Sequence, residues 1–414
     1  MVPAAKKLWN RDFSLLVFGQ IMSLFGNMVL SFALPLYILD ISGSPALFGL
    51  VMSLPYISLV IMSPIGGIIA DRLKKQRIMF WLDVSTTIII VLYIAASGFF
   101  TAIVPIVIVK LMALNAIQGL YMPAVHSSVP LLVSADKLVP ANAVTSSVNM
   151  FSNMAGMAIA GVVYASFGLF PILAVSAVCF AITAVMDLLI RIPYNKQENP
   201  ENIGEMVKRD MYASSKFMVK EKPIIAKSAV IIFFMQASVA SMLTVGVSVL
   251  ISQNLGLGME LVGISQSIMM AGGLFGGIMA GTLGARLTMK KAPLLLLFAS
   301  VAITPIALPF LFSMPAFLGF IIITAASFLT VSVIQMAQVQ FFAFIQGETP
   351  NELIGKVVSL IAVLPFIASA LGMFTYGVLF EQFYTLPWIT VFATVFVSGM
   401  VALYSRRLYA KALR

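Results

Sequence analysis

Few residues of this sequence have side chains that could take part in catalysis. It contains one cysteine, Cys179, and one histidine, His126. This excludes a disulfide framework and any Cys-based zinc or iron–sulfur site, and it argues against a His-rich metal site. The sequence lacks the G-x-x-x-x-G-K-[ST] motif that binds nucleotide phosphates, so this chain is not itself an ATP-driven pump. No His, Cys or paired-carboxylate constellation supports catalysis. We therefore expect a protein that is not an enzyme, with no metal and no cofactor.

Three charged residues lie inside long apolar stretches, where an unpaired charge is costly. Asp187 precedes Arg191 by four residues, which predicts an ion pair on one helix. Asp83 lies near the basic segment 72–77, so it either joins that charge network or acts as a coupling charge. Lys110 has no acidic residue nearby in the sequence. It either extends outward to water or lies in a cavity, as a cation that attracts an anionic substrate or alternates between counter-ions.

Uncharged polar residues recur at helical spacing in four of the apolar stretches. Such faces predict a central cavity that contacts substrate; the alternative is hydrogen bonding between helices without a ligand. The residues are Gln20, Ser23 and Asn27; Asn115 and Gln118; Gln236 and Thr244; and Gln335 and Gln338. The chain also contains 26 methionines, whose flexible thioethers suit a cavity that adapts to bulky apolar ligands.

The elements that position these residues are membrane-spanning helices. The 414-residue chain is 61% hydrophobic and only 10% charged, whereas soluble domains have about 45–50% apolar and about 25% charged residues. Twelve stretches are long enough to cross a bilayer. They run at 13–39, 45–70, 78–100, 102–125, 143–165, 168–190, 228–252, 261–285, 292–313, 315–345, 354–380 and 385–405.

The basic residues fall on one side of these stretches. All 25 Lys and Arg except Lys110 lie before the first stretch, after the last, or in the even-numbered connections, with Lys356 at the start of the eleventh stretch counted with the tenth connection. By the positive-inside rule both termini are therefore cytoplasmic, which requires an even number of spans. This distribution accounts for the net charge of +10 without a nucleic-acid partner.

A polar segment divides the chain into two halves of six spans. We expect an N-terminal half at 1–190, a cytoplasmic linker at 191–227 and a C-terminal half at 228–414. Apolar residues among the charges of the linker predict an amphipathic helix on anionic lipid. An internal repeat supports the division, since GGIIADRL at 66–73 and GGIMAGTL at 276–283 share five of eight positions.

The eighth stretch is rich in glycine at four-residue spacing, which predicts close helix packing. Its glycines include Gly272, Gly273, Gly276, Gly277 and Gly281. In a moving protein such packing would permit sliding between the halves; the alternative is static packing or a dimer contact.

The segment between the second and third stretches carries a recognisable motif. Here the sequence resembles the major facilitator superfamily, whose signature in this loop reads G-x-x-x-D-R-x-x-R/K-R. Gly67, Asp71 and Arg72 match it at the expected spacing, and Lys75 and Arg77 supply the distal cations. Lys74 replaces the usual glycine. The resemblance implies that these residues form a gate at the cytoplasmic side.

The resemblance extends over nearly the whole chain and is closest to the drug and siderophore efflux branch that includes macrolide exporters. It rests on the order of short matches, such as Asn10-Arg11-Asp12-Phe13 and Ala141-Asn142-Ala143. It implies an all-α bundle of two pseudo-symmetric six-helix halves in a bacterial cytoplasmic membrane, and a monomer. The implied function is export of hydrophobic or amphipathic small molecules driven by protons.

Two departures weaken the proton assignment. The fourth stretch has Asn115 where the superfamily signature has arginine, and the fifth approximates G-x-x-x-G-P without the proline. A proton-coupled nutrient importer and a lipid-linked flippase therefore remain as alternatives.

Overall fold

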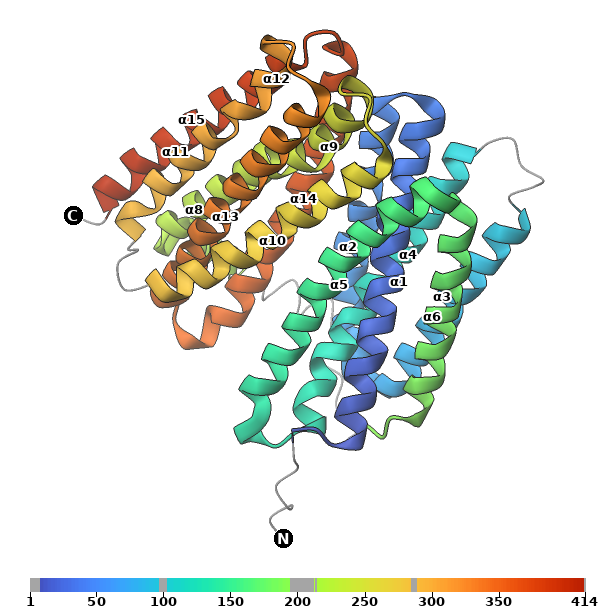
Figure 1. Ribbon diagram of the computed structural model, residues 1–414. Coiled ribbons are helices and arrows are strands. Elements are labelled where there is room, and N and C mark those ends of the chain that lie inside the picture. Colours follow the sequence, from blue (N-terminus) through green and yellow to red (C-terminus); the bar gives the residue numbers. More distant parts are fainter. Residues whose placement is uncertain (1–7, 97–102, 194–211, 213, 284–288, 413–414) are drawn as a thin grey trace. The chain divides into compact units, whose positions relative to one another are not determined.

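The computed structural model describes residues 8–96, 103–193, 212, 214–283 and 289–412 (Figure 1). Across these ranges, twelve helices are long and apolar enough to cross a membrane. Each overlaps one predicted stretch, so the predicted all-α membrane fold is confirmed. The helical form follows from the apolar composition, because a segment in lipid must satisfy its backbone hydrogen bonds internally. The chain is thus a multi-pass membrane protein.

The chain forms two compact units, which are described separately. Unit 1 comprises Met1–Ile41 and Leu54–Pro200, and unit 2 comprises Ser42–Ser53 and Glu201–Arg414. The division predicted at residues 190 and 227 stays a prediction. The amphipathic helix predicted in the linker lies mostly outside the described residues.

Unit 1 is built from long antiparallel helices. They are α1 (Arg11–Ser42), the part of α2 (Pro45–Arg72) from Leu54 onward, α3 (Lys75–Ala96), α4 (Ile103–Leu132), α5 (Leu138–Phe167) and α6 (Leu169–Leu189). The turn between α5 and α6 is the single residue Gly168, whose φ of 74° favours glycine. In this unit α3 packs extensively against α6. This packing brings the acidic residues of the two helices together.

The core of unit 1 gathers at the helix ends that carry the basic loop. Phe13 of α1, Met79 of α3 and Tyr121 of α4 belong to one buried cluster there. Nearby, Gly66 of α2 lies directly on Gly119 of α4, and a Cβ at Gly66 would be 2.5 Å from the Gly119 carbonyl oxygen. The α2 and α4 backbones are therefore in direct contact.

Unit 2 contains the remaining helices, two of which are interrupted. Its elements are α8 (Pro223–Met235), a π-helical turn at Gln236–Ala240, α9 (Ser241–Val249), α10 (Met259–Leu283), α11 (Ala292–Ala302), α12 (Leu308–Leu311), α13 (Ala316–Glu348), α14 (Asn351–Gln382) and α15 (Pro387–Ala412). The π-helical turn joins α8 to α9 within one span, Pro223–Asn254. Such turns inside helices are frequent at functional sites.

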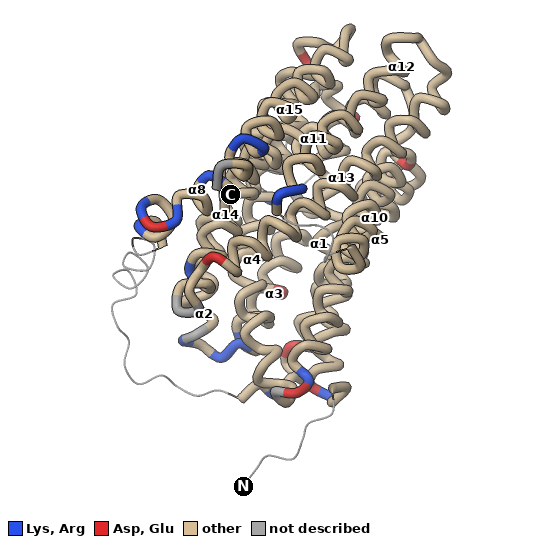
Figure 2. Tube along the Cα trace, turned by 90° about the vertical axis from the view of Figure 1, so that its left-hand side faces the viewer, with Lys and Arg blue, Asp and Glu red and all other residues tan. Residues whose placement is uncertain are grey.

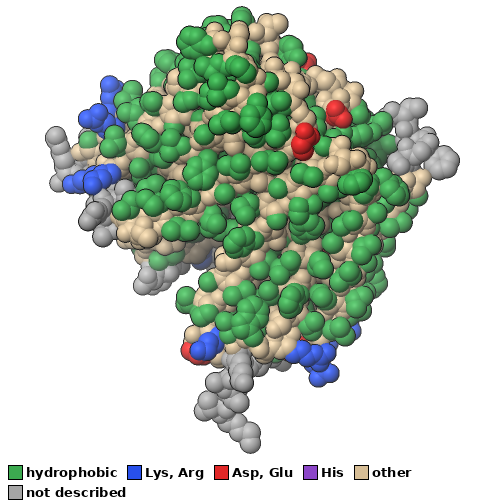
Figure 3. Space-filling view, viewed as in Figure 1, with side chains coloured by type: hydrophobic (Ala, Val, Ile, Leu, Met, Phe, Trp, Pro, Cys, Tyr) green, Lys and Arg blue, Asp and Glu red, His purple; other side chains and the backbone are tan. Residues whose placement is uncertain are grey.

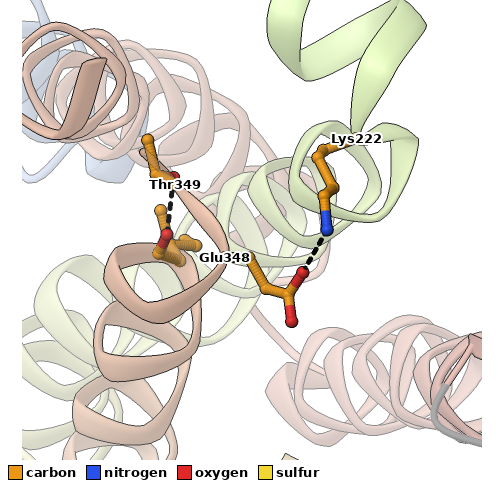
Figure 4. Close-up of polar contacts among 4 residues, drawn as sticks. Lys222, Glu348 and Thr349 are labelled. Atoms are coloured by element: carbon orange, nitrogen blue, oxygen red, sulfur yellow. Dashed lines mark hydrogen bonds and ion pairs between the residues drawn. The ribbon is translucent and has the colours of Figure 1, made fainter. Parts of the chain in front are cut away.

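The N-terminus of α8 is held against the C-terminus of α13 by an ion pair (Figure 4). Lys222 Nζ lies 2.6 Å from Glu348 Oε2, and the next residue, Thr349, donates a hydrogen bond of 2.6 Å to the Ile345 carbonyl. Both charged side chains are partly exposed, so the ion pair contributes at most about 1 kcal/mol. It fixes the beginning of α8 against the last turn of α13.

The sequence repeat has a structural counterpart in the helix packing of unit 2. Gly272 and Gly276 of α10 lie against the backbone of α13 at Phe328 and Ser332, and a Cβ at either glycine would overlap that backbone. Gly276 occupies the repeat position of Gly66, which contacts α4 in the same way. Gly67 and Gly277, the neighbouring repeat positions, meet little or nothing.

The beginning of α2, up to Ser53, belongs to unit 2 and packs within it. Gly49 lies on Gly377 of α14, where a Cβ would be 2.8 Å from the Gly377 Cα. Glu381 Oε2 accepts hydrogen bonds from the Ser44 hydroxyl and from the Ala46 backbone N–H, the latter at 3.0 Å. This carboxylate therefore caps the N-terminus of α2.

Charged residues lie mainly at helix ends, and the helix sides are apolar. Figure 2 shows most Lys and Arg near the ends of helices. Figure 3 shows a viewed face covered largely by hydrophobic side chains. Large apolar side chains such as Val109, Phe170 and Phe396 are exposed. A surface of this kind is suited to contact with lipid.

Candidate functional site

The predicted gate motif lies at the end of α2 and the start of α3. The side chain of Asp71 lies outside the described part of the structure. Lys75 Nζ donates a hydrogen bond of 2.9 Å to the Ala70 carbonyl, so it caps the C-terminus of α2. Lys74 and Arg77 line a groove with Trp81 and Leu120. The predicted gate role of Gly67, Asp71, Arg72, Lys75 and Arg77 stays a prediction.

The predicted polar face of α1 divides into buried and partly exposed residues. Gln20 and Ser23 are 2% and 3% exposed, whereas Asn27 is half-buried. The Ser23 side chain hydrogen-bonds with Asp83 of α3 and with Tyr121 of α4. Gln20 Oε1 is buried without a hydrogen-bond partner. Gln20 and Ser23 therefore face the interior of unit 1.

Asp83 and Asp187 form a buried pair that the sequence analysis missed. The two carboxyl groups, on α3 and α6, lie within hydrogen-bonding reach of each other, and each residue is 1% exposed. One oxygen of each carboxyl, Oδ2, has no hydrogen-bond partner. We call these two residues the acid pair.

The acid pair replaces both local pairings expected from the sequence. Among the described residues Asp187 forms no ion pair with Arg191, and Asp83 forms none with the basic segment 72–77. Spacing along one helix shows which residues share a face, but it does not show which residues of a neighbouring helix that face contacts. The only sequence signal was the presence of two acidic residues within apolar stretches.

Lys110 is buried rather than extended to water. Its side chain on α4 is 3% exposed, and its Nζ lies 3.9 Å from the centre of the Tyr93 ring on α3. This ammonium group has no hydrogen-bond partner among the described residues. The ring face offers a cation–π contact that offsets part of the cost of burying the charge.

The other predicted polar residues are half-buried. Asn115 Nδ2 donates to the Leu111 carbonyl at 3.1 Å, and Thr244 Oγ1 donates to the Ala240 carbonyl at 2.9 Å, both within their own spans. Gln118 of α4 and Gln335 of α13 also keep part of their surface exposed. These residues retain surface that a ligand could contact.

Gln236 and Gln338 come together in unit 2. Both line one cavity with Met235, Leu296 and Phe341. The π-helical turn begins at Gln236, whose Nε2 donates to the Ser369 hydroxyl of α14 at 3.0 Å. Two amides in an apolar wall are the kind of polar groups that orient a ligand.

Unit 1 has an apolar groove between α1 and α5. It is lined by Ile21 and Phe25 from α1 and by Val148, Phe151 and Ala155 from α5. Its wall contains Ser147 and Ser152 but no charged residue. A groove of this composition suits a hydrophobic ligand with few polar groups.

The described side chains provide no metal centre. Within these residues no group of three or more His, Cys, Asp or Glu side chains is arranged to hold a metal ion. Among the described residues the site therefore offers apolar surface, a few amides, one buried cation and one buried acid pair.

Several known transport proteins are similar to this chain. The chain is 22% identical over 400 residues to macrolide efflux protein A of Streptococcus pyogenes, covering 94% of each protein. A nucleoside transporter structure superimposes with a TM-score of 0.79 at 13% identity, covering 97% of this chain and 100% of that one. A D-xylose–proton symporter structure gives 0.74 at 12% identity, covering 95% and 96%.

These structural likenesses concern the fold alone. The family itself is shown by sequence, because residues 16–373 match the profile of the Major Facilitator Superfamily. With twelve apolar helices among its described residues, this chain is a membrane transporter that belongs to the Major Facilitator Superfamily.

Proposed function

We propose that this transporter exports hydrophobic or amphipathic small molecules, such as macrolide-like drugs or siderophores, in exchange for protons. The observation that carries the proposal is the apolar groove of unit 1, whose wall of Ile21, Phe25 and Phe151 has no charged residue. Sugars and nucleosides need many hydrogen-bonding partners, and such a wall provides few. The match to a macrolide efflux protein over 94% of the chain supports the same substrate class.

The proposed cycle is alternating access by two six-helix halves of a monomer. Rocking of the two halves against each other would open the substrate path first to one membrane face and then to the other. Gln236 and Gln338 would then orient the polar end of a ligand, with Asn27, Asn115, Gln118, Thr244 and Gln335 as further contacts.

The proposed location is the cytoplasmic membrane of a bacterium, with both termini in the cytoplasm. The support is the distribution of basic residues, all of which except Lys110 lie at the termini, in even-numbered connections or, for Lys356, at the edge of one. A transporter in this orientation meets drugs that have entered the cell.

Inside-out membrane vesicles test the proposal. With an imposed proton gradient, we expect a macrolide or another compound of the class to cause substrate-dependent proton release from the vesicle. The panel should include macrolides, cationic dyes and siderophores, with a nucleoside and a pentose as polar controls. Movement of protons in the same direction as the polar controls, with no drug response, would indicate an importer. Transfer of a fluorescent lipid without a drug response would indicate a flippase.

The proposed gate gives a sharper prediction. Asp71→Asn should slow transport at least about tenfold, equivalent to about 1.4 kcal/mol, because it removes a charge that would stabilise one closed state. Binding of labelled drug to the purified protein should change less than about twofold, equivalent to about 0.4 kcal/mol. Equal losses of binding and transport would contradict a gate role. Asp136→Asn, at an exposed acidic residue, is the matched control.

A further inference from the structure

The acid pair is a polar site buried within an apolar bundle. Asp83 and Asp187 approach each other within hydrogen-bonding reach, and a hydrogen bond between two carboxyl groups requires a proton on one of them. Two ionised carboxylates at this distance would repel each other in surroundings of low polarity. The two carboxyl groups can therefore stay this close only while a positive charge, such as a bound proton, offsets the negative charge of one of them.

The described side chains of the neighbouring helices supply no such cation. The groups that face the pair are Ser23 from α1 and Tyr121 from α4, both neutral hydrogen-bonding side chains. Among the described residues neither carboxyl has a basic side chain within ion-pair distance. The positive charge that offsets the two carboxylates must therefore come from solution.

Three unpartnered oxygen atoms mark this region. They are Oδ2 of Asp83, Oδ2 of Asp187 and Oε1 of Gln20, and all three residues are at most 2% exposed. Gln20 lies one helical turn from Ser23, the α1 residue that contacts the pair. Buried acceptors without donors are rare in folded proteins, and they are satisfied when a proton or a hydrogen-bond donor is added.

The two carboxyl groups of the acid pair lie at different distances from the helix ends, an arrangement that suits proton transfer. Asp187 lies in the last turn of α6, which ends at Leu189, whereas Asp83 lies about two turns into α3. A proton that reaches Asp187 from the helix ends can pass to Asp83 through their shared hydrogen bond. Intramembrane carboxylates are the groups that proton-coupled transporters use as relays.

The geometry points to Asp83 and Asp187 as a two-carboxylate site that binds one exchangeable proton, which is the proton exchanged for substrate. Binding converts one carboxylate to a carboxylic acid and leaves the pair with a single negative charge. Release leaves two adjacent charges, which repel each other and loosen the contact between α3 and α6. The assignment of this proton to transport rests on the proposed function, whereas its binding does not.

Infrared difference spectroscopy tests proton binding directly. Full-length protein in lipid nanodiscs is titrated with acid and base, and the carbonyl band of a protonated carboxyl is followed in H₂O and D₂O. We expect a band that shifts in D₂O and disappears as the pH rises. Asp83→Asn and Asp187→Asn should each move its midpoint to lower pH by at least about one unit, a tenfold weaker proton affinity, because the remaining carboxyl loses its like-charged neighbour. The double variant should lack the band.

Asp136→Asn is the matched control for these spectra. Asp136 is exposed outside the spans, and a hydrogen bond from Ser134, together with Lys137 3.2 Å away, lowers the pKa of its carboxyl. Its substitution should leave the band unchanged. A band that persists in the double variant, or midpoints unaffected in both single variants, would overturn the proton site. Loss of the band on adding sodium at constant pH would also overturn it, because the site would then bind a metal cation.

Transport measurements separate this inference from the proposed function. In the double variant, gradient-driven drug export should fall at least tenfold while drug exchange without a gradient continues. Proton-driven export that survives in the double variant would overturn the coupling role and leave the proposed function intact. The wild-type protein could instead show the titrating carbonyl band but exchange no drug for protons. That result would refute the proposed function and the coupling role, and the proton site would stand.

Discussion

Replacement of Gly276 by valine should disrupt unit 2, whereas replacement of the adjacent Gly277 should have little effect. A Cβ at Gly276 would overlap the backbone of Ser332, and a Cβ at Gly277 would meet only the Gln335 Cγ at 4.0 Å. Forcing extra carbon atoms into a close-packed contact costs about 1–3 kcal/mol. Because the obstacle is backbone rather than a flexible side chain, we expect the upper end of this range.

The measurement is the thermal midpoint of the detergent-solubilised protein, followed by size-exclusion chromatography after heating. Gly276→Val should lower the midpoint and the amount of folded protein in the membrane, and Gly277→Val should match the wild type. Both substitutions exchange the same residue types in the same helix, so differences in helix propensity largely cancel. Equal destabilisation by the two variants would contradict the close contact of α10 with α13.

The sequence repeat provides a second matched pair in unit 1. Gly66 lies on Gly119, and Gly67 has nothing within 4 Å of where its Cβ would be. Gly66→Val should therefore act like Gly276→Val, and Gly67→Val like Gly277→Val. Agreement between the pairs would show that the duplicated halves use the same glycine for the same helix contact.

These glycines illustrate what the sequence could predict and what it could not. The four-residue spacing predicted close packing in the eighth stretch, and the packing of Gly272 and Gly276 against α13 agrees with it. The family motif drew attention to Gly67, yet Gly66 makes the contact in unit 1. Spacing gives the face of a helix, but the rotation of that helix against its neighbour depends on the whole bundle.

The spans themselves were predictable because their signal is local. A run of about 20 apolar residues identifies a membrane helix without knowledge of its neighbours. The acid pair depends instead on a contact between α3 and α6, whose acidic residues lie about one hundred positions apart in the chain. From the sequence, Arg191 was the nearest partner for Asp187 on the same helix. In the structure, the packing of α3 against α6 places Asp83 beside Asp187 instead.

Substitution of Lys110 is expected to have the second large effect on stability, an increase rather than a decrease. Lys110→Met should raise the stability of the protein, because the structure buries the ammonium at 3% exposure without a hydrogen-bond partner. An unpaired buried charge costs several kcal/mol after relaxation, and the Tyr93 ring at 3.9 Å returns about 0.5–2 kcal/mol of this. Methionine has nearly the same length and no charge to desolvate. We therefore expect a gain of roughly 1–3 kcal/mol from the substitution.

Thermal unfolding in nanodiscs measures this gain, and a double-mutant cycle with Tyr93→Leu identifies its origin. Tyr93→Leu should cost about 0.5–2 kcal/mol more in the presence of Lys110 than in the Lys110→Met background, because only the former loses a cation–π contact. Lys110→Arg keeps the charge and should bring no gain. A lower midpoint for Lys110→Met would mean that lipid headgroups or water already solvate the ammonium, as in an outward-extended lysine. A higher midpoint combined with slower drug export would mean that the protein tolerates a destabilising cation because transport requires it.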